Sequence, residues 1–133
     1  MPVDLTVRTE NEPGALAAVA AAISDAGLNL AAATYTGGGP SAELHLLVKH
    51  AGPTRDALAR AGIDVASERE VVVVDADDKP GALTDLTRRI AAGGVNLDLV
   101  YVATGTRLVF GAQDLDALRA ALGVTSADGA TVG

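Results

Sequence analysis

The 133-residue chain contains no cysteine and no tryptophan, and its only aromatic residues are Tyr35, Tyr101 and Phe110. Without cysteine there is no disulfide framework and no thiolate metal site. Basic residues are also scarce, since 10 Lys and Arg stand against 17 Asp and Glu and give a formal net charge of −7. Nucleic acid and anionic membranes both require a basic surface, so the composition argues against either partner.

Long apolar runs and targeting signals are missing as well. The longest apolar runs are far too short to cross a bilayer. The first residues lack the basic stretch and apolar run of a secretory signal. We therefore expect a soluble cytoplasmic protein.

Small apolar side chains are abundant. Hydrophobic residues make up 49% of the chain, mostly Ala, Val and Leu, which is enough for a packed core. Two halves of about 65 residues would each be marginally stable alone. We therefore expect the halves, or two chains, to associate.

Two sequence motifs occur twice at the same spacing. Residues 11–16, Asn-Glu-Pro-Gly-Ala-Leu, recur at 78–83 as Asp-Lys-Pro-Gly-Ala-Leu. Residues 26–30, Ala-Gly-Leu-Asn-Leu, recur at 93–97 as Gly-Gly-Val-Asn-Leu. Both pairs are offset by 67 residues, so the intervening segment has the same length in each copy. The chain is therefore an internal duplication.

In the first copy, alternation of Val3, Leu5 and Val7 with polar residues predicts a strand. A helix is predicted from Pro13 to Gly27, because proline suits its first turn and glycine its end. Its apolar stripe is Leu16, Val19, Ala20 and Ile23. The remaining elements are predicted as strands at 29–36 and 43–48, a helix at 54–61 and a strand at 63–67.

The second copy repeats this order. The run at 71–74 predicts a strand buried on both faces, and Leu83, Leu86 and Ile90 mark a helix. Strands are predicted at 96–103 and 107–112 around a turn at 104–106. Leu115, Leu118 and Leu122 mark the second helix, and 124–126 the last strand. The sequence thus predicts an α+β fold of two tandem ferredoxin-like βαββαβ units, residues 1–67 and 68–133, with antiparallel sheets and helices on one face of each. The tail from about residue 124 is poorly defined.

The two motifs resemble the ACT domain, a regulatory module attached to enzymes such as 3-phosphoglycerate dehydrogenase. The resemblance extends from Pro2 to about Gly123 as two tandem units without a catalytic domain, like small stand-alone bacterial tandem-ACT proteins. It implies that an amino acid binds where two ACT units meet, between the loop before the first helix and the second strand of a neighbour. The ligand-binding residues that it implies are Asn11, Gly14, Ala15, Leu16 and Asn29 in the first copy, and Asp78, Gly81, Ala82, Leu83 and Asn96 in the second.

The chemistry of these residues suits an amino acid. A helix N-terminus presents free N–H groups and partial positive charge to a carboxylate, and glycine lets a ligand approach the backbone. An Asn side chain can donate to a carboxylate and accept from an ammonium group. Structural explanations are also open: Gly14 and Gly81 for close helix–sheet packing, Asn11 as a helix cap, and Asn29 and Asn96 as turn residues.

The loop of the second copy is acidic. Asp78 stands where the first copy has Asn11, and Asp75 and Asp77 precede it. These charges repel a ligand carboxylate. Either the second site binds mainly the ammonium group or the loop is only structural, and the first copy is expected to be the better carboxylate site.

The histidines and tyrosines suggest no further site. His45, in a predicted strand, and His50, in a loop, lack a third metal ligand at suitable spacing, so we expect surface groups and no metal site. Tyr35 and Tyr101 are expected to fill the core, and the alternative is that they line the interface between units.

The sequence therefore predicts an amino-acid-binding regulatory protein, an allosteric sensor of amino-acid metabolism that acts on a metabolic enzyme or regulator. A homodimer is expected, because ferredoxin-like sheets expose an edge strand. The alternative is a ligand-independent regulatory or structural subunit of a metabolic enzyme. No Ser/His/Asp set or metal constellation is visible, so we expect neither catalysis nor a cofactor.

Overall fold

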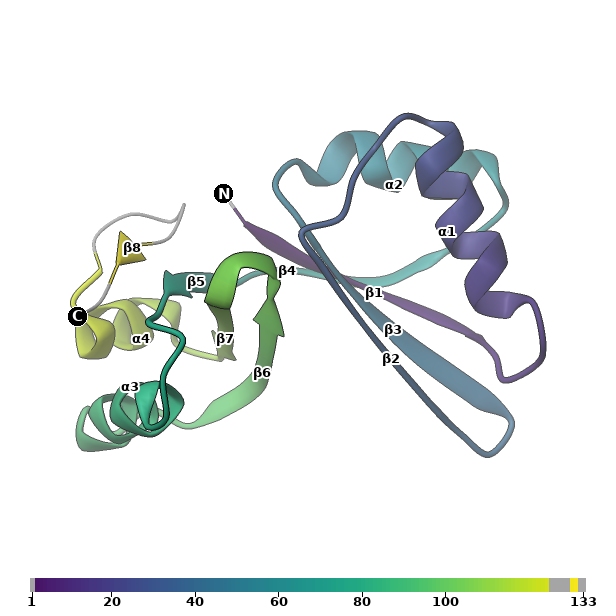
Figure 1. The fold of residues 1–133 in the computed structure, drawn as a ribbon. Coiled ribbons are helices and arrows are strands. Elements are labelled where there is room, and N and C mark those ends of the chain that lie inside the picture. The colour runs from purple at the N-terminus through teal and green to yellow at the C-terminus, as the bar shows by residue number, and fades with distance from the viewer. Residues whose placement is uncertain (1, 125–129, 132–133) are drawn as a thin grey trace. The chain divides into compact units, whose positions relative to one another are not determined.

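The first part of the chain forms a four-stranded sheet covered by two helices in the computed structural model, which describes residues 2–124 and 130–131. Its elements are β1 (Val3–Glu10), α1 (Ala15–Asp25), β2 (Ala32–Gly38), β3 (Ser41–Val48), α2 (Ala51–Arg60) and β4 (Val65–Glu70). The strand order is β2-β3-β1-β4, and β3 is antiparallel to both β1 and β2. Both helices lie on one face of this sheet (Figure 1).

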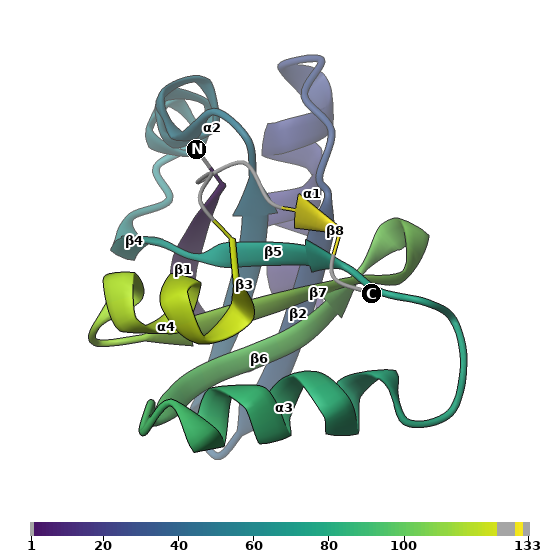
Figure 2. The same ribbon diagram turned by 90° about the vertical axis from the view of Figure 1, so that its left-hand side faces the viewer.

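The second part repeats the arrangement. Its elements are β5 (Val72–Asp75), α3 (Ala82–Ala92), β6 (Leu97–Ala103), a 3₁₀ turn (Thr104–Thr106), β7 (Arg107–Ala112), α4 (Leu115–Leu122) and β8 (Ala130–Thr131). The strand order is β6-β7-β5-β8, with β7 antiparallel to β5 and β6, and the short β8 parallel to β5. Figure 2 shows α3 and α4 on one face of this sheet. The predicted α+β fold of two tandem ferredoxin-like units is confirmed.

Contacts divide the chain into two compact units at Arg69 and Glu70. The first unit is Val3–Arg69. The second begins at Glu70 and also includes Pro2, whose carbonyl accepts a hydrogen bond of 3.2 Å from the backbone N–H of Val71. The boundary expected between residues 67 and 68 rests on the sequence repeat and stays a prediction.

Each unit has its own core between sheet and helices. In the first, Leu5, Leu44 and Leu46 from the sheet meet Val19 and Ile23 from α1. In the second, the core consists of Val72, Val74, Leu86, Ile90, Leu108, Phe110, Ala112, Leu118, Leu122 and Val124. The run at 71–74 is buried along its whole length, as the sequence predicts.

Several element boundaries differ from the sequence prediction. Helix α1 begins at Ala15 and not at Pro13, because Gly14 has a left-handed φ of 87° that is incompatible with a right-handed helix. Helix α2 begins at Ala51, three residues early, because Pro53 in a first turn needs no N–H partner. Strand β2 begins three residues later than predicted and β4 two residues later. The predicted strand at 124–126 lies mostly outside the described residues.

The described helices do not include one that is both long enough and apolar enough to span a membrane.

Candidate ligand-binding site

The first helix of each unit begins at a glycine in the left-handed conformation. Gly14 has a φ of 87° and Gly81 a φ of 92°. No described side chain caps either helix, and a Cβ added at either glycine would meet no described atom within 4 Å. Backbone conformation therefore explains these glycines, and close helix–sheet packing does not. Both helix starts are open to an approaching ligand.

Asn11 connects the loop before α1 to the hairpin between β2 and β3. Its Nδ2 donates a 3.0 Å hydrogen bond to the carbonyl of Gly39. A Cβ on Gly37 would lie 2.8 Å from Asn11 Oδ1, so the side chain fits against a glycine. The N-cap of α1 is Gly14, so the capping role considered for Asn11 is wrong. Its role in ligand binding stays a prediction.

One leucine in each copy is left out of its core. Leu16 is 42% exposed and Leu83 is 44% exposed, although both belong to predicted apolar stripes. In each helix the first buried residue of the stripe is the next apolar position, three residues further on, which is Val19 in α1 and Leu86 in α3. The same departure at equivalent positions indicates a shared feature of the two units.

A second exposed apolar position is also shared. Tyr35 on β2 is 36% exposed and Val102 on β6 is 65% exposed, and they are 67 residues apart, like the motifs. Each pairs with a buried leucine, Leu44 or Leu108, so each points to the helix-covered face. The expectation that Tyr35 fills the core is therefore wrong, because β2 is an edge strand. Tyr101 is buried, but it points to the opposite, helix-free face of β6 and is not part of the core between sheet and helices.

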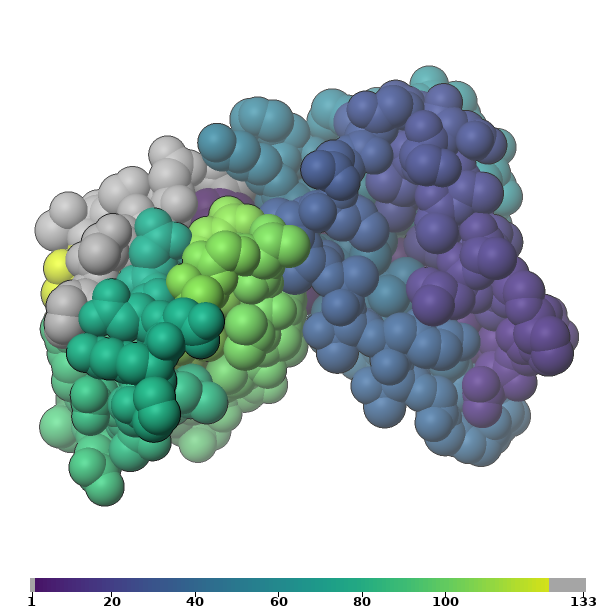
Figure 3. Space-filling view, in the orientation of Figure 1, coloured from purple at the N-terminus to yellow at the C-terminus, as the bar shows by residue number. Residues whose placement is uncertain are grey.

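In the second unit these features meet at a hollow of about 200 Å³, which we call the apolar hollow. It lies between the β5–α3 loop (residues 76–81), the first turn of α3 and the β6–β7 hairpin. Figure 3 shows the teal surface of the loop and α3 beside the green surface of the hairpin. The lining residues are Ala76, Asp77, Asp78, Lys79, Ala82, Leu83, Val102, Thr106 and Leu108.

Three predicted site residues, Asp78, Ala82 and Leu83, line this hollow, and Gly81 is in the same loop. Sequence reasoning missed Val102 and Leu108. The 67-residue offset that aligns Val102 with Tyr35 was the signal available for the former.

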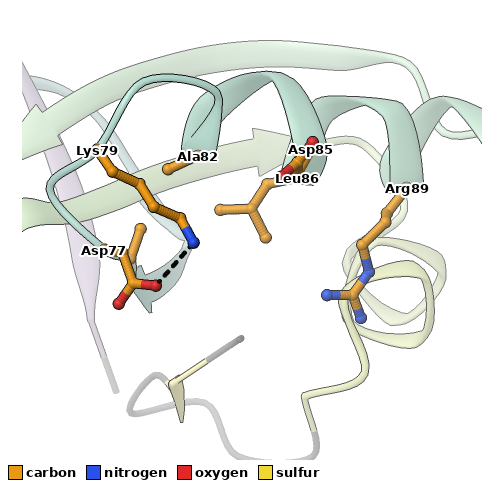
Figure 4. A pocket seen from close by; sticks show the side chains of 7 residues that line it. Asp77, Lys79, Ala82, Asp85, Leu86 and Arg89 are labelled. Atoms are coloured by element: carbon orange, nitrogen blue, oxygen red, sulfur yellow. Dashed lines mark ion pairs between the residues drawn. The ribbon is translucent and has the colours of Figure 1, made fainter.

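A smaller hollow of about 50 Å³, which we call the charged hollow, borders the same loop (Figure 4). Lys79 Nζ lies 3.3 Å from Asp77 Oδ2 across its mouth. Asp85 and Arg89 from α3 also line it, and Arg89 Nη2 donates to the carbonyl of Leu122 at 3.0 Å. Ala76 and Leu86 complete its lining together with Ala82. The two hollows thus share Ala76, Asp77, Lys79 and Ala82. They differ in the aliphatic side chains of the first and in Asp85 and Arg89 of the second.

The first unit has a shallower depression of about 310 Å³ between α1 and α2. It lies at the end of α1 away from Gly14, and its lining residues are Ala22, Asp25, Ala26, Ala57, Arg60 and Ala61. These residues all differ from the predicted site residues.

Asn29 and Asn96 lie far from the loops within their own units. Each follows a helix of 11 residues whose other end is the glycine, and such a helix is about 16 Å long. Both asparagines are exposed. A single unit therefore does not bring all the predicted residues together. Ala15 and Leu16 stay with Gly14 at the start of α1.

A polar cluster occupies the helix-free face of the first sheet. His45 Nδ1 lies 3.0 Å from Asp4 Oδ1, and His45 Nε2 lies 2.8 Å from Glu43 Oε1. Thr6 Oγ1 donates to Asp4 Oδ1 at 3.2 Å. The Asp4 side chain is fully buried and that of His45 is 22% exposed, so His45 is not the surface group expected from the sequence.

The carboxylates control the protonation of His45. Burial lowers the pKa of His45, but hydrogen bonds and charge from Asp4 and Glu43 outweigh it, so the pKa is raised above its ordinary value. The hydrogen bond from His45 is the main cause of the lowered pKa of Glu43. Burial opposes it, and the charge of His45 together with the hydrogen bond and charge of Arg8 adds to the lowering. Within residues 2–124 and 130–131, no group of three or more acidic or histidine side chains is arranged to hold a metal ion.

The fold and the glycine–helix junctions define an architecture. The chain has the fold of two tandem ACT-like βαββαβ units, and the first helix of each begins at a glycine in the left-handed conformation. No known family model matches its sequence, and no curated protein matches it either.

Solved structures do match this fold. The protein BT0572 from Bacteroides thetaiotaomicron superposes with a TM-score of 0.82 at 22% identity, over 91% of this chain and 85% of that one. The ligand-free regulatory subunit of aspartate kinase from Thermus thermophilus matches with a TM-score of 0.65 at 18% identity, over 92% and 89%. The same subunit from Thermus flavus matches at 0.57 and 17% identity, over 90% and 89%. At these identities the likeness concerns the fold.

Proposed function

We propose that this protein binds an amino acid at the β5–α3 loop and regulates an enzyme or regulator of amino-acid metabolism. The observation that carries the proposal is the apolar hollow, because it lies where the ACT resemblance places a ligand and is lined by Asp78, Ala82 and Leu83. Its size suits a small molecule. Two of the matching folds are regulatory subunits of aspartate kinase, which supports a regulatory role without catalysis.

The two ends of an amino acid have different partners at this loop. The start of α3 offers uncapped N–H groups and partial positive charge to the carboxylate. Asp77 and Asp78 offer carboxylates to the ammonium group of the ligand, and Asp77 already forms an ion pair with the side-chain ammonium group of Lys79. A ligand ammonium group competes with Lys79 for this position. The acidic loop thus supports a site that binds mainly the ammonium end.

A second chain completes the site in this proposal. Asn29 and Asn96 lie about 16 Å, one helix length, from the loops of their own units, so in this proposal each reaches a loop of a different unit, which we assign to a neighbouring chain. The strands β2 and β6 stand at the ends of their sheets, where a strand of another chain can be added. Ligand bound at this contact favours one packing of the chains, which is how binding controls a partner protein.

The test is thermal unfolding of the purified protein with each of the twenty amino acids. A ligand at about a hundred times its dissociation constant adds roughly 2.7 kcal/mol to the stability, a shift of several degrees. Asp78→Asn should weaken the response, because the ammonium group loses a charged partner. Asp64→Asn removes the same charge at an exposed residue of the first unit and should leave the response unchanged.

A flat response to all twenty amino acids would contradict the proposal. The function would then be the alternative one, a regulatory or structural subunit that acts through protein contacts alone. The Lys79–Asp77 ion pair, which closes the loop on itself, is the observation that favours this alternative.

A further inference from the structure

The wall of the apolar hollow opposite the charged loop consists of aliphatic side chains. Leu83 comes from the first turn of α3, Val102 from β6 and Leu108 from β7. Val102 is 65% exposed, the highest value among the large apolar side chains of the described residues. Exposed aliphatic surface inside a concave site has a free-energy cost that a matching ligand removes.

Charged groups are confined to one side of this hollow. Asp77, Asp78 and Lys79 all come from the β5–α3 loop. Among the described lining residues, the hairpin side contributes a single polar side chain, Thr106, and its Oγ1 donates to the carbonyl of Ala76 at 2.8 Å. That hydroxyl holds the hairpin to the loop. A polar or charged group placed against Leu83, Val102 and Leu108 would therefore lose its hydration without gaining a partner.

We propose that the second unit selects amino acids with aliphatic side chains, such as valine, leucine or methionine. This inference rests on the proposed function and deepens it. The charged head group lies at the β5–α3 loop, and the side chain lies on Leu83, Val102 and Leu108. Each methylene that becomes buried there is worth about fourfold in affinity.

The first unit differs at the equivalent position. Tyr35 stands where the second unit has Val102, so an aromatic ring with a hydroxyl group replaces an isopropyl group. The selectivity for aliphatic ligands therefore belongs to the second unit. Exchanging this residue between the copies tests that assignment directly.

The experiment is a ligand series measured by thermal unfolding and isothermal titration calorimetry on the full chain. Glycine, alanine, α-aminobutyrate, norvaline and norleucine differ by single methylenes, and their affinities should rise about fourfold per step until the hollow is filled. Serine, lysine and glutamate, with polar or charged side chains, should bind more weakly than the aliphatic amino acids of similar length.

The matched variants are Val102→Thr and Val100→Thr. Both side chains are exposed on the same face of β6, so neither change should disturb folding. Only Val102 lines the hollow, so only its replacement should affect the ligand. Val102→Thr should weaken binding of the best aliphatic ligand roughly tenfold. Val100→Thr should leave it within about twofold, an effect smaller than one methylene. Val102→Tyr, which introduces the residue of the first copy, should also abolish the methylene dependence.

The outcomes separate the two proposals. If no amino acid binds, the proposed function itself fails. If amino acids bind but polar or charged ones bind best, or if Val102→Thr behaves like Val100→Thr, the proposed function stands and the aliphatic selectivity is overturned. If Val102→Thr changes the number of associated chains but not the ligand affinity, Val102 belongs to a contact between chains, and the aliphatic selectivity is again overturned.

Discussion

Both ring nitrogens of His45 face carboxylate oxygens, at 3.0 Å from Asp4 and 2.8 Å from Glu43. A neutral imidazole has one N–H donor and one lone pair, so it can donate to only one of them. The imidazolium donates to both. The arrangement therefore favours the protonated ring, in agreement with the raised pKa of His45. Thr6 also donates to Asp4, and Arg8 lies beside Glu43 at 3.4 Å.

This cluster predicts that stability depends on pH. The pKa of His45 is raised in the folded state. The contribution of its protonated ring to folding stability is therefore complete below the ordinary histidine pKa and is lost as the pH rises through the pKa of the folded state. In His45→Gln, urea unfolding at about pH 6 should show a loss on the order of 2 kcal/mol, the worth of a hydrogen bond to a charged group. The difference from the unmodified protein should shrink above about pH 8.

His50→Gln is the control for this measurement, since His50 is exposed at the start of α2. The lowered pKa of Glu43 gives the opposite pH dependence. The contribution of its carboxylate to folding stability is present above the ordinary glutamate pKa and is lost in acid. A loss in His45→Gln that stays constant from pH 6 to pH 9, values that span roughly the titration range of histidine, would show that packing and not protonation is responsible.

At the scale of the elements, the two loop–helix junctions depend on backbone conformation. An L-residue in the left-handed region costs roughly 1–2 kcal/mol, so Gly14→Ala and Gly81→Ala should each destabilise by about that amount. Gly52→Ala is the matched control, because Gly52 lies in the first turn of α2 outside the positive-φ region and has space for a Cβ. It should stabilise by about 0.5–1 kcal/mol.

Urea unfolding of the three variants tests this explanation. Equal stability in Gly81→Ala and Gly52→Ala would mean that the α3 junction adopts another conformation in solution. In Gly81→Ala a shifted junction should also weaken any ligand response, whereas Gly14→Ala should leave the response of the second unit intact.

The elements also show what the sequence could and could not predict. The bounds of strand β7 and the glycine that follows α1, Gly27, were predicted correctly, because turn glycines and short apolar runs act locally. The exposure of Leu83 was not predicted. Helical periodicity identifies residues that share a stripe, but not which of them are buried against the sheet. The prediction that Tyr35 is buried was wrong for a related reason. Whether a strand lies at the edge of its sheet depends on the strand order, which a single sequence leaves undetermined.

For the candidate site, the repeated motif led to the loop, and the wall of the apolar hollow required the fold. Val102 and Leu108 are aliphatic residues in apolar strands, and nothing local distinguishes them from Val109, which is fully buried. Their meeting with Leu83 depends on the register between β6 and β7.

At the scale of the whole molecule, the two copies have kept one face and changed the other. Both helix-covered faces form apolar cores and leave the same two positions exposed. On the helix-free faces, Asp4, Thr6 and His45 of the first copy correspond to Val71, Val73 and Val109 of the second, by the repeat and the strand register. These three valines are at most 5% exposed. Conservation of fold together with divergence of one face is expected of two units with different tasks.

The proposed dimer makes a prediction at this scale. If Asn29 or Asn96 reaches the loop of a neighbouring chain, the folded state is linked to association, and the unfolding temperature should rise with protein concentration. Static light scattering at micromolar concentration should give the mass of two chains. A ligand that bridges the chains should shift the dissociation equilibrium toward the dimer by the same factor as dimer formation raises ligand affinity, because the coupling is reciprocal.

Sedimentation across roughly a hundredfold range of protein concentration, with and without ligand, measures both sides of that linkage. Asn96→Ala should weaken ligand binding and leave the mass of the ligand-free protein unchanged, because in the proposed dimer the asparagine contacts the ligand and the sheet edges hold the chains together. A monomer that still binds its amino acid with full affinity would contradict the shared site, and would place the whole binding site on the β5–α3 loop and the apolar hollow of a single unit.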